Sequence, residues 1–388
     1  MCGGLAILIW IVSAKPIKLW RAYVMQSWFW PVAILILLPW IGLLYTPDRS
    51  GFGIDFATKT YYWLYAFVVA GIPFTRFSPE RLMQAFFIGL AINALVAILQ
   101  ILGIIPKLNP VAYGLGLGSS TMAVFLPLGI LMASYYFRDT NEKRKRIVYG
   151  LLMGTYFFHL ISLVGRAGFL TFFVVSPLIL RNLFGRLKPL KISLVYVGLV
   201  GIMLLSPSVW ERIHRSIDQI KYHFNADSKL ALGEGYNDEE IRLYMWGGAL
   251  QIFLENPILG IGTGGYPITL HERGDPDWPI VAHPHSDLLY MAASFGIIGI
   301  FAFLWFFWEL VRNAWKERDT PLGFFIFSAA IVFLISGLAT SEIVDAQTGF
   351  LLALVAGLQN GLMKFSGVII HNHPEVQTIL PMNKVDEA

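Results

Sequence analysis

Long apolar runs, most of them about the length of a helix, alternate along this chain with polar segments. The apolar runs cover residues 1–14, 28–46, 59–74, 82–105, 115–137, 147–165, 167–181, 190–206, 288–311, 321–340 and 346–363. An apolar run of about 17–25 residues can cross a bilayer as a helix. The pattern therefore predicts an all-α, polytopic membrane protein with about eleven or twelve transmembrane helices.

The polar connections between these runs fall into two classes by charge. Lys and Arg concentrate in alternate connections, at 15–21, 76–81, 138–146, 181–191 and 312–318, and the tail belongs to the same class. The positive-inside rule assigns this class to the cytoplasm. We therefore expect transmembrane helices over 1–206, a long loop facing away from the cytoplasm over 207–287, transmembrane helices over 288–363 and a cytoplasmic tail over 364–388. This loop is the periplasmic loop if the membrane is a bacterial inner membrane.

Composition supports a membrane protein and removes several other classes. Hydrophobic residues make up 56% of the chain and charged residues only 14%, whereas a soluble domain carries roughly a quarter charged residues. The net charge of +4 does not indicate nucleic-acid binding, because the basic residues are sorted by side. A single cysteine, Cys2, excludes an internal disulfide and any cysteine-based metal site.

The long outer loop contains one predicted amphipathic helix, over residues 238–256. Asn237 can cap it, with Glu240 three residues later in a pattern like a capping box. Its expected apolar face consists of Ile241, Met245, Leu250, Phe253 and Leu254. A proline and a glycine-rich turn, "GIGTGGY" (260–266), follow the helix. We expect this helix to pack on the membrane core or to lie at the membrane surface.

Two stretches resemble a known family. They are "RLYMWGGALQIFLENPILGIGTGGY" (242–266) and "HSDLLYMAASFGIIG" (285–299). Together they look like the O-antigen ligase and O-antigen polymerase superfamily, which has an Arg four residues before a Trp, a glycine motif, and a histidine opening a transmembrane helix. "LVGRAGF" around Arg166 matches a further family feature. The sequence departs from the pattern at Ser286 and Ser294, where the family usually has Asn and often has Glu.

The resemblance implies an inner-membrane glycosyltransferase whose active site faces the periplasm. Family ligases transfer a glycan from undecaprenyl diphosphate to lipid A–core oligosaccharide, and polymerases join it to another repeat unit. The resemblance implies no metal and no cofactor. The ligase-like stretch "PWIGLLYTPD" (39–48) and the single long outer loop favour a ligase over the alternative, a polymerase.

The candidate site residues follow from the chemistry of that reaction. Arg166 and Arg242 are expected to bind the diphosphate, because guanidinium pairs with phosphate oxygens in a bidentate manner and stays ionised. His285 is the expected general base, since imidazole can accept a proton near neutral pH, and His283 is a second candidate. The motif "HPH" shows no third ligand at a telling spacing, so no metal site is expected.

Less specific roles exist for each of these residues. Arg166 could be an interfacial side chain that reaches the headgroups, although its small neighbours Gly165, Ala167 and Gly168 suggest room for a ligand. Arg242 could form an ion pair with Asp238, and His283 could be a solvated histidine.

A different class of protein, a lipid-linked oligosaccharide transporter, is the second alternative. Transporters tend to show repeated halves and charges near the bilayer midplane. No repeat is visible in this sequence, and its intramembrane charge is sparse.

Overall fold

The computed structural model describes residues 23–72, 78–108, 113–163, 167–185, 189–204, 214, 238–274 and 280–365, and these residues fold into helices joined by turns. The first half contains α3 (Phe29–Gly42), η1 (Arg49–Gly53), α4 (Ile54–Lys59), η2 (Thr60–Trp63), α5 (Leu64–Ala70), α6 (Pro79–Ile101), α7 (Ser119–Asp139), α8 (Lys143–Ser162), α9 (Ala167–Phe184) and α10 (Pro189–Leu204). The second half contains α12 (Asp238–Glu255), α13 (Gly265–Arg273), α14 (Asp287–Lys316), α15 (Pro321–Ser336) and α16 (Ala346–Phe365). The prediction of an all-helical chain is confirmed for this part of the protein.

The predicted apolar runs from 28–46 onward all coincide with helices, whereas the first run, 1–14, lies outside the described residues. Four described helices are long and apolar enough to cross a membrane: α6, α7, α9 and α14. Two further apolar helices, α3 and α15, are shorter. The chain is therefore a multi-helix membrane protein, and the full count of eleven or twelve spans remains a prediction.

The run predicted as a single span over 59–74 is divided. It begins with the last residue of α4, passes through the 3₁₀ turn η2 and continues as α5. Thr60 marks the break, because its hydroxyl donates to the carbonyl of Ala57 at 2.7 Å and accepts from Trp40 Nε1 at 3.1 Å. This turn places the Tyr62 hydroxyl against the carbonyl of Ile343.

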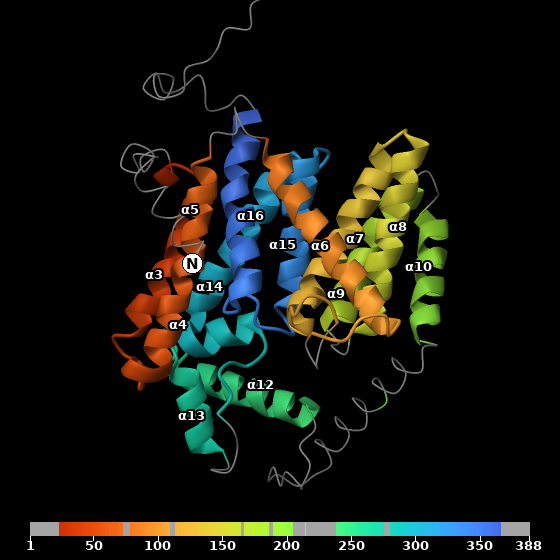
Figure 1. The fold of residues 1–388 in the computed structure, drawn as a ribbon. Helices are drawn as coiled ribbons and strands as arrows, with labels where there is room; N and C mark the ends of the chain where they lie inside the picture. The colour runs from red at the N-terminus through yellow and green to blue at the C-terminus, as the bar shows by residue number, and fades with distance from the viewer. Residues whose placement is uncertain are drawn as a thin grey trace, which may run out of the picture.

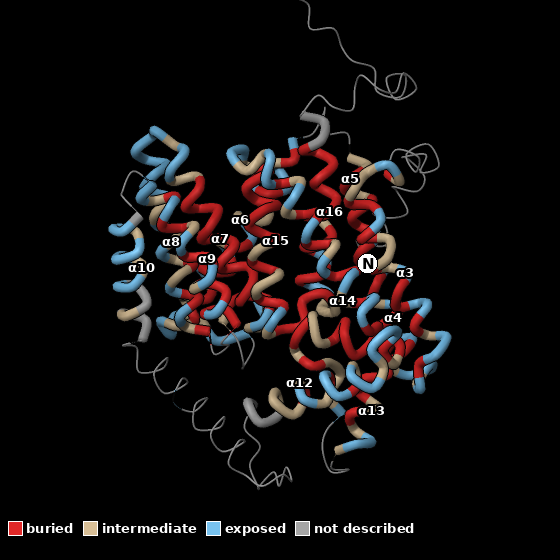
Figure 2. The backbone as a smooth tube through the Cα atoms, turned by 180° about the vertical axis from the view of Figure 1, so that it is seen from behind, coloured by how far each residue is buried: buried red, intermediate tan, exposed pale blue. Residues whose placement is uncertain are grey.

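The core of the bundle lies along α7, which packs on α8, α9 and α15. Every residue of α7 from Thr121 to Tyr135 is buried. In Figure 2 the buried positions line the interior of the bundle, and the exposed ones lie on its periphery. Many peripheral side chains are large and apolar, including Ile88, Leu95, Leu151, Val197, Phe301 and Trp308, as expected for a surface in contact with hydrocarbon.

Connections predicted on the same side of the membrane meet at the same end of the bundle. At one end, the hydroxyl of Thr121 hydrogen-bonds Gln347 Oε1 at 2.9 Å. At the other end, the Tyr135 hydroxyl donates to the carbonyl of Asp319 at 2.6 Å. Figure 1 shows α12 and α13 beyond the first of these ends, across the base of the bundle. The side of the membrane that each end faces stays a prediction.

Candidate active site

The two candidate histidines lie in the turn that leads into α14. Their ring centroids are 4.6 Å apart, with the ring planes at 76°. Ser286 caps the helix, and its side chain accepts a hydrogen bond from the amide of Leu289 at 3.4 Å. The structure therefore brings His283 and His285 together at a helix N-terminus, where amide groups favour negative charge.

His285 has an unusual backbone conformation. Its φ is 49°, and it is the one non-glycine residue with positive φ among the described residues. Such a conformation costs on the order of 1–3 kcal/mol and persists only where the surrounding structure enforces it. On one side, Trp246 Nε1 donates to the carbonyl of Pro284 at 2.9 Å. On the other, the amide of Asp287 donates to the carbonyl of Gly337 at 2.7 Å.

His283 differs from His285 in its chemistry. Burial, with smaller contributions from nearby His285 and Lys59, lowers the pKa of His283 to about 4. Lys59 is itself paired with Asp55, with Nζ and Oδ2 at 2.7 Å. A neutral imidazole with so low a pKa is a weak base near neutral pH. The site therefore favours His285 over His283 for proton transfer.

Two buried carboxyl groups beside the turn had no assigned role in the sequence analysis. Asp287 is fully buried, and its Oδ1 accepts the amide of Ile343 at 3.0 Å. Glu342 is 1% exposed, and its Oε1 accepts hydrogen bonds from the hydroxyls of Ser336, at 2.7 Å, and Thr340. These contacts tie the start of α14 to the α15–α16 connection. An acid at the edge of an apolar run was the available sequence signal, since buried charge beside a membrane demands a partner.

The glycine motif packs its backbone into a break in α14. Gly296 has φ 62° and ψ −149°, which interrupts the helix. The amides of Ile261 and Gly262 donate to the carbonyls of Ala293 and Ser294 at 3.0 and 2.9 Å, and the amide of Ile297 donates to the carbonyl of Pro257 at 2.8 Å. Backbone groups released by a broken helix at membrane depth must find such partners inside the protein.

The glycines themselves permit this close approach. Gly260, Gly262 and Gly264 all have positive φ. A Cβ at Gly262 would lie 2.6 Å from the carbonyl oxygen of Gly42 on α3. The motif therefore acts through the backbone, because its close contacts hold the segment 260–264 against α3 and α14.

The helix predicted over 238–256 is present as α12, but its buried face differs from the expectation. Met245, Ala249 and Ile252 are buried, together with Tyr266 and Leu270 of α13. Leu250 and Leu254, which were placed on the apolar face, are 50% and 67% exposed. Apolar residues occupy both sides of α12, so hydrophobic periodicity did not identify the side that packs on the protein. Asn237 and the side chains of Glu240 and Ile241 lie outside the described residues.

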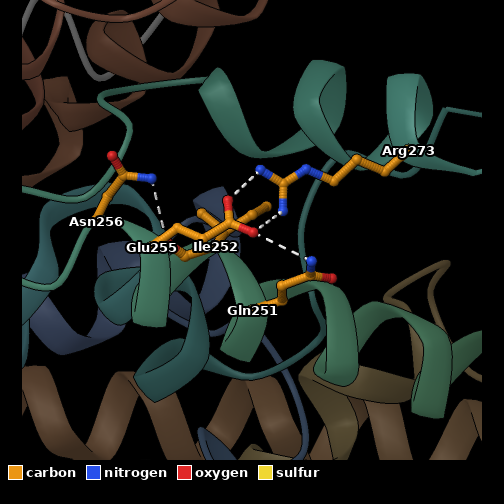
Figure 3. Close-up of polar contacts among 5 residues, drawn as sticks. All are labelled: Gln251, Ile252, Glu255, Asn256 and Arg273. Carbon is orange, nitrogen blue, oxygen red and sulfur yellow. Dashed lines mark hydrogen bonds and ion pairs between the residues drawn. The ribbon is translucent and has the colours of Figure 1, made fainter.

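An ion pair fastens α12 to α13. Arg273 donates to both carboxylate oxygens of Glu255, at 3.1 and 2.5 Å, and Gln251 donates to the same carboxylate at 3.1 Å. Figure 3 shows this group, with Arg273 reaching across from α13 and Asn256 bonded to the carbonyl of Ile252. The hydrogen bonds from Arg273 hold the pKa of Glu255 below its ordinary value. Arg273 thus has a structural partner in place.

The structure describes one of the two candidate arginines, Arg242, and not the other. Arg242 is half-buried on α12, one helical turn before Trp246, whose indole contacts the histidine turn. The side chain of Asp238, its alternative partner, lies outside the described residues, as does Arg166. The nearby small residue Gly168 does not leave room for a ligand, because a Cβ there would lie 2.9 Å from Leu160 and 3.3 Å from Ala123. Gly168 serves the packing of α9 against α7 and α8.

The fold and the site define a helical membrane protein with a histidine turn at one end of its bundle, joined to α12, which lies across that end. The sequence model of the family described as "O-Antigen ligase" matches residues 112–304. This match covers just under half of the chain, and it confirms the resemblance seen in the sequence. The matched region contains α7 to α10, α12, α13 and the first part of α14, with both histidines and both arginines.

A curated protein of Rickettsia conorii is also similar. It is named "Putative polysaccharide ligase" and is 23% identical over 184 residues. The aligned region covers 46% of this chain and 42% of that relative. The chain thus spans less than half the length of the relative it matches.

Proposed function

We propose that this protein transfers an O-antigen glycan from undecaprenyl diphosphate to a hydroxyl of lipid A–core oligosaccharide, at the periplasmic face of the inner membrane. The observation that carries this proposal is the strained histidine turn, held between the N-terminus of α14 and the Trp246 side of α12. Backbone strain of this kind is concentrated at functional sites. The family match supports the ligase or polymerase class of reaction.

In this proposal His285 is the general base. A sugar hydroxyl has a pKa far above neutrality, so its proton must be removed as the oxygen attacks the anomeric carbon. The bond from that carbon to the diphosphate breaks in the same reaction, and the lipid diphosphate leaves with the electron pair. His283, with a pKa of about 4, stays neutral beside His285 and does not add a second positive charge.

The diphosphate needs cationic partners, and we assign this role to Arg242 and Arg166. A planar guanidinium can donate two hydrogen bonds to phosphate oxygens while it remains charged. Arg242 suits the role because α12 carries it on the helix that contacts the histidine turn. Arg273 is less suited, since Glu255 already accepts both of its hydrogen bonds. The part assigned to Arg166 rests on the family resemblance alone.

A purified protein in liposomes tests the proposal. The donor is a glycan on undecaprenyl diphosphate, and lipid A–core and free lipid-linked repeat units are offered as separate acceptors. We expect glycosylated lipid A–core, with His285→Ala slowing transfer by at least about 100-fold. His271→Ala is the matched control, because His271 is also a histidine but lies on α13, outside the histidine turn. A fully active His285→Ala variant would exclude the base assignment.

The same assay separates the alternatives. Elongated lipid-linked glycan in place of glycosylated lipid A–core would identify a polymerase. Loss of transfer with EDTA and recovery with a divalent cation would refute the metal-independent mechanism. Arg242→Lys keeps the charge but loses the bidentate geometry, so we expect it to weaken donor use. Full activity of Arg242→Lys would refute bidentate recognition at that position.

A further inference from the structure

One hydrogen bond joins α12 to the histidine turn. Trp246 Nε1 donates to the carbonyl oxygen of Pro284 at 2.9 Å. Pro284 immediately precedes His285, so this oxygen belongs to the peptide plane whose rotation defines φ of His285. The indole N–H therefore acts directly on the torsion angle that is strained, at φ 49°.

The opposite side of the turn is already fixed within the bundle. The amide of Asp287 donates to Gly337 at 2.7 Å, and its Oδ1 accepts the amide of Ile343 at 3.0 Å. These two bonds fix the backbone that follows His285. Without a restraint on the preceding peptide plane, rotation about φ would let His285 relax to a negative value, which non-glycine residues prefer.

Trp246 is well placed to supply that restraint. The indole packs against the small buried cluster of Met245, Ala249, Ile252, Tyr266, Leu270 and Ala293. This packing and the hydrogen bond to Pro284 hold the indole, so the N–H direction is set before any substrate binds. Arg242 lies four residues earlier, and residues at this spacing share a helix face. The indole therefore connects the helix that carries Arg242 to the backbone of His285.

We propose that Trp246 is a positioning residue: it holds His285 in the conformation needed for proton transfer and fixes that conformation relative to Arg242 on α12. This inference rests on the proposed function, in which His285 is the base. Trp246 itself takes no proton and does not contact the reacting atoms. Its effect should appear in the rate of the chemical step rather than in donor binding.

The test is Trp246→Phe in the reconstituted transferase, which keeps an aromatic ring and removes the N–H. We expect kcat to fall about tenfold, the effect of one hydrogen bond, with KM for the lipid-linked donor unchanged within about twofold. Replacement of Trp246 by benzothienylalanine, which keeps the ring size and exchanges the N–H for sulfur, should reproduce the loss. This second variant decides the question if Trp246→Phe folds poorly.

Tyr244→Phe is the matched control. Tyr244 lies on the same helix, and its hydroxyl donates to the carbonyl of Leu270 at 2.9 Å, so the substitution also removes a bond from a side chain to the backbone. That bond fastens α12 to α13 and not to the histidine turn. We expect Tyr244→Phe to retain wild-type kcat. An equal loss of kcat in Tyr244→Phe would mean that general loosening of α12 is responsible, and would overturn the inference.

The remaining outcomes separate this inference from the proposed function. Wild-type kcat in the benzothienylalanine variant, with His285→Ala inactive, would refute the positioning role alone. Wild-type transfer by His285→Ala would refute the proposed base and this inference with it. An increase in donor KM at constant kcat would place Trp246 in donor binding and would also overturn the positioning role.

Discussion

A substitution at the break in α14 tests how the segment 257–262 is held against that helix. Gly296 has φ 62° and ψ −149°, a region that is essentially restricted to glycine. A Cβ at this position would overlap the backbone carbonyl of Ile258. We predict that Gly296→Ala forces the loop at 257–262 away from α14 and weakens the hydrogen bonds between the two backbones.

The expected size of the effect follows from those two costs. Forcing a non-glycine residue into this conformation costs about 2 kcal/mol. Three hydrogen bonds join the loop to the break, each contributing about 1 kcal/mol, and partial loss of the set adds about 2 kcal/mol. We therefore expect Gly296→Ala to destabilise the folded protein by about 4 kcal/mol. The histidine turn should lose its alignment as well, because it leads directly into the first part of the same helix.

Tryptophan fluorescence during thermal unfolding in detergent measures the loss of stability. The glycan-transfer assay measures the loss of activity. Gly247→Ala is the control, because Gly247 lies inside α12 with nothing within 4 Å of an added Cβ. Alanine is the better helix former there by about 1 kcal/mol, so that variant should be at least as stable as the wild type. If Gly296→Ala unfolds at the wild-type temperature and transfers glycan at the wild-type rate, the break is not a required feature.

Two further predictions concern charged groups outside the membrane-spanning helices. Burial raises the pKa of Glu342 from 4.5 to about 7, so between these pH values the folded state holds a proton that the unfolded chain has released. The stabilisation from this proton is fully present below pH 4.5. It is lost as the pH rises through about 7. Glu342→Gln should remove up to about 3 kcal/mol of this pH dependence. Unfolding measured between pH 5 and 8 tests this, and an unchanged pH profile would contradict the raised pKa of Glu342. Arg273→Gln breaks an ion pair between partly exposed side chains, Arg273 and Glu255, and should leave the unfolding temperature almost unchanged. A clear loss of thermal stability would mean that this pair, rather than side-chain packing, holds α12 to α13.

The sequence predicted the helices well because hydropathy is a local property. Each apolar run within the described part of the chain folds as helix. The same property limits the prediction. An apolar side chain leaves water equally well for lipid or for protein, so Leu250 and Leu254 of α12 were placed on the packed face although they are exposed.

The candidate site was predictable in its residue types and only partly in its construction. The resemblance around the glycine motif pointed to His285, and the structure places it with His283 in one turn. The roles of Asp287 and Glu342 were missed, because their partners lie in connections that hydropathy treats as ordinary loops. The room inferred beside Arg166 was also wrong at Gly168, which helix packing explains.

By itself, the sequence determined that this chain forms apolar helices, that its connections alternate in charge, and that it carries a family motif around His285. Only the tertiary structure decided how that histidine is held. Its backbone conformation depends on Trp246, 39 positions earlier in the chain, and its helix is anchored by Ile343, 56 positions after Asp287. Bonds between segments so far apart form only when the helices pack, and no local pattern of apolar and polar residues encodes their geometry.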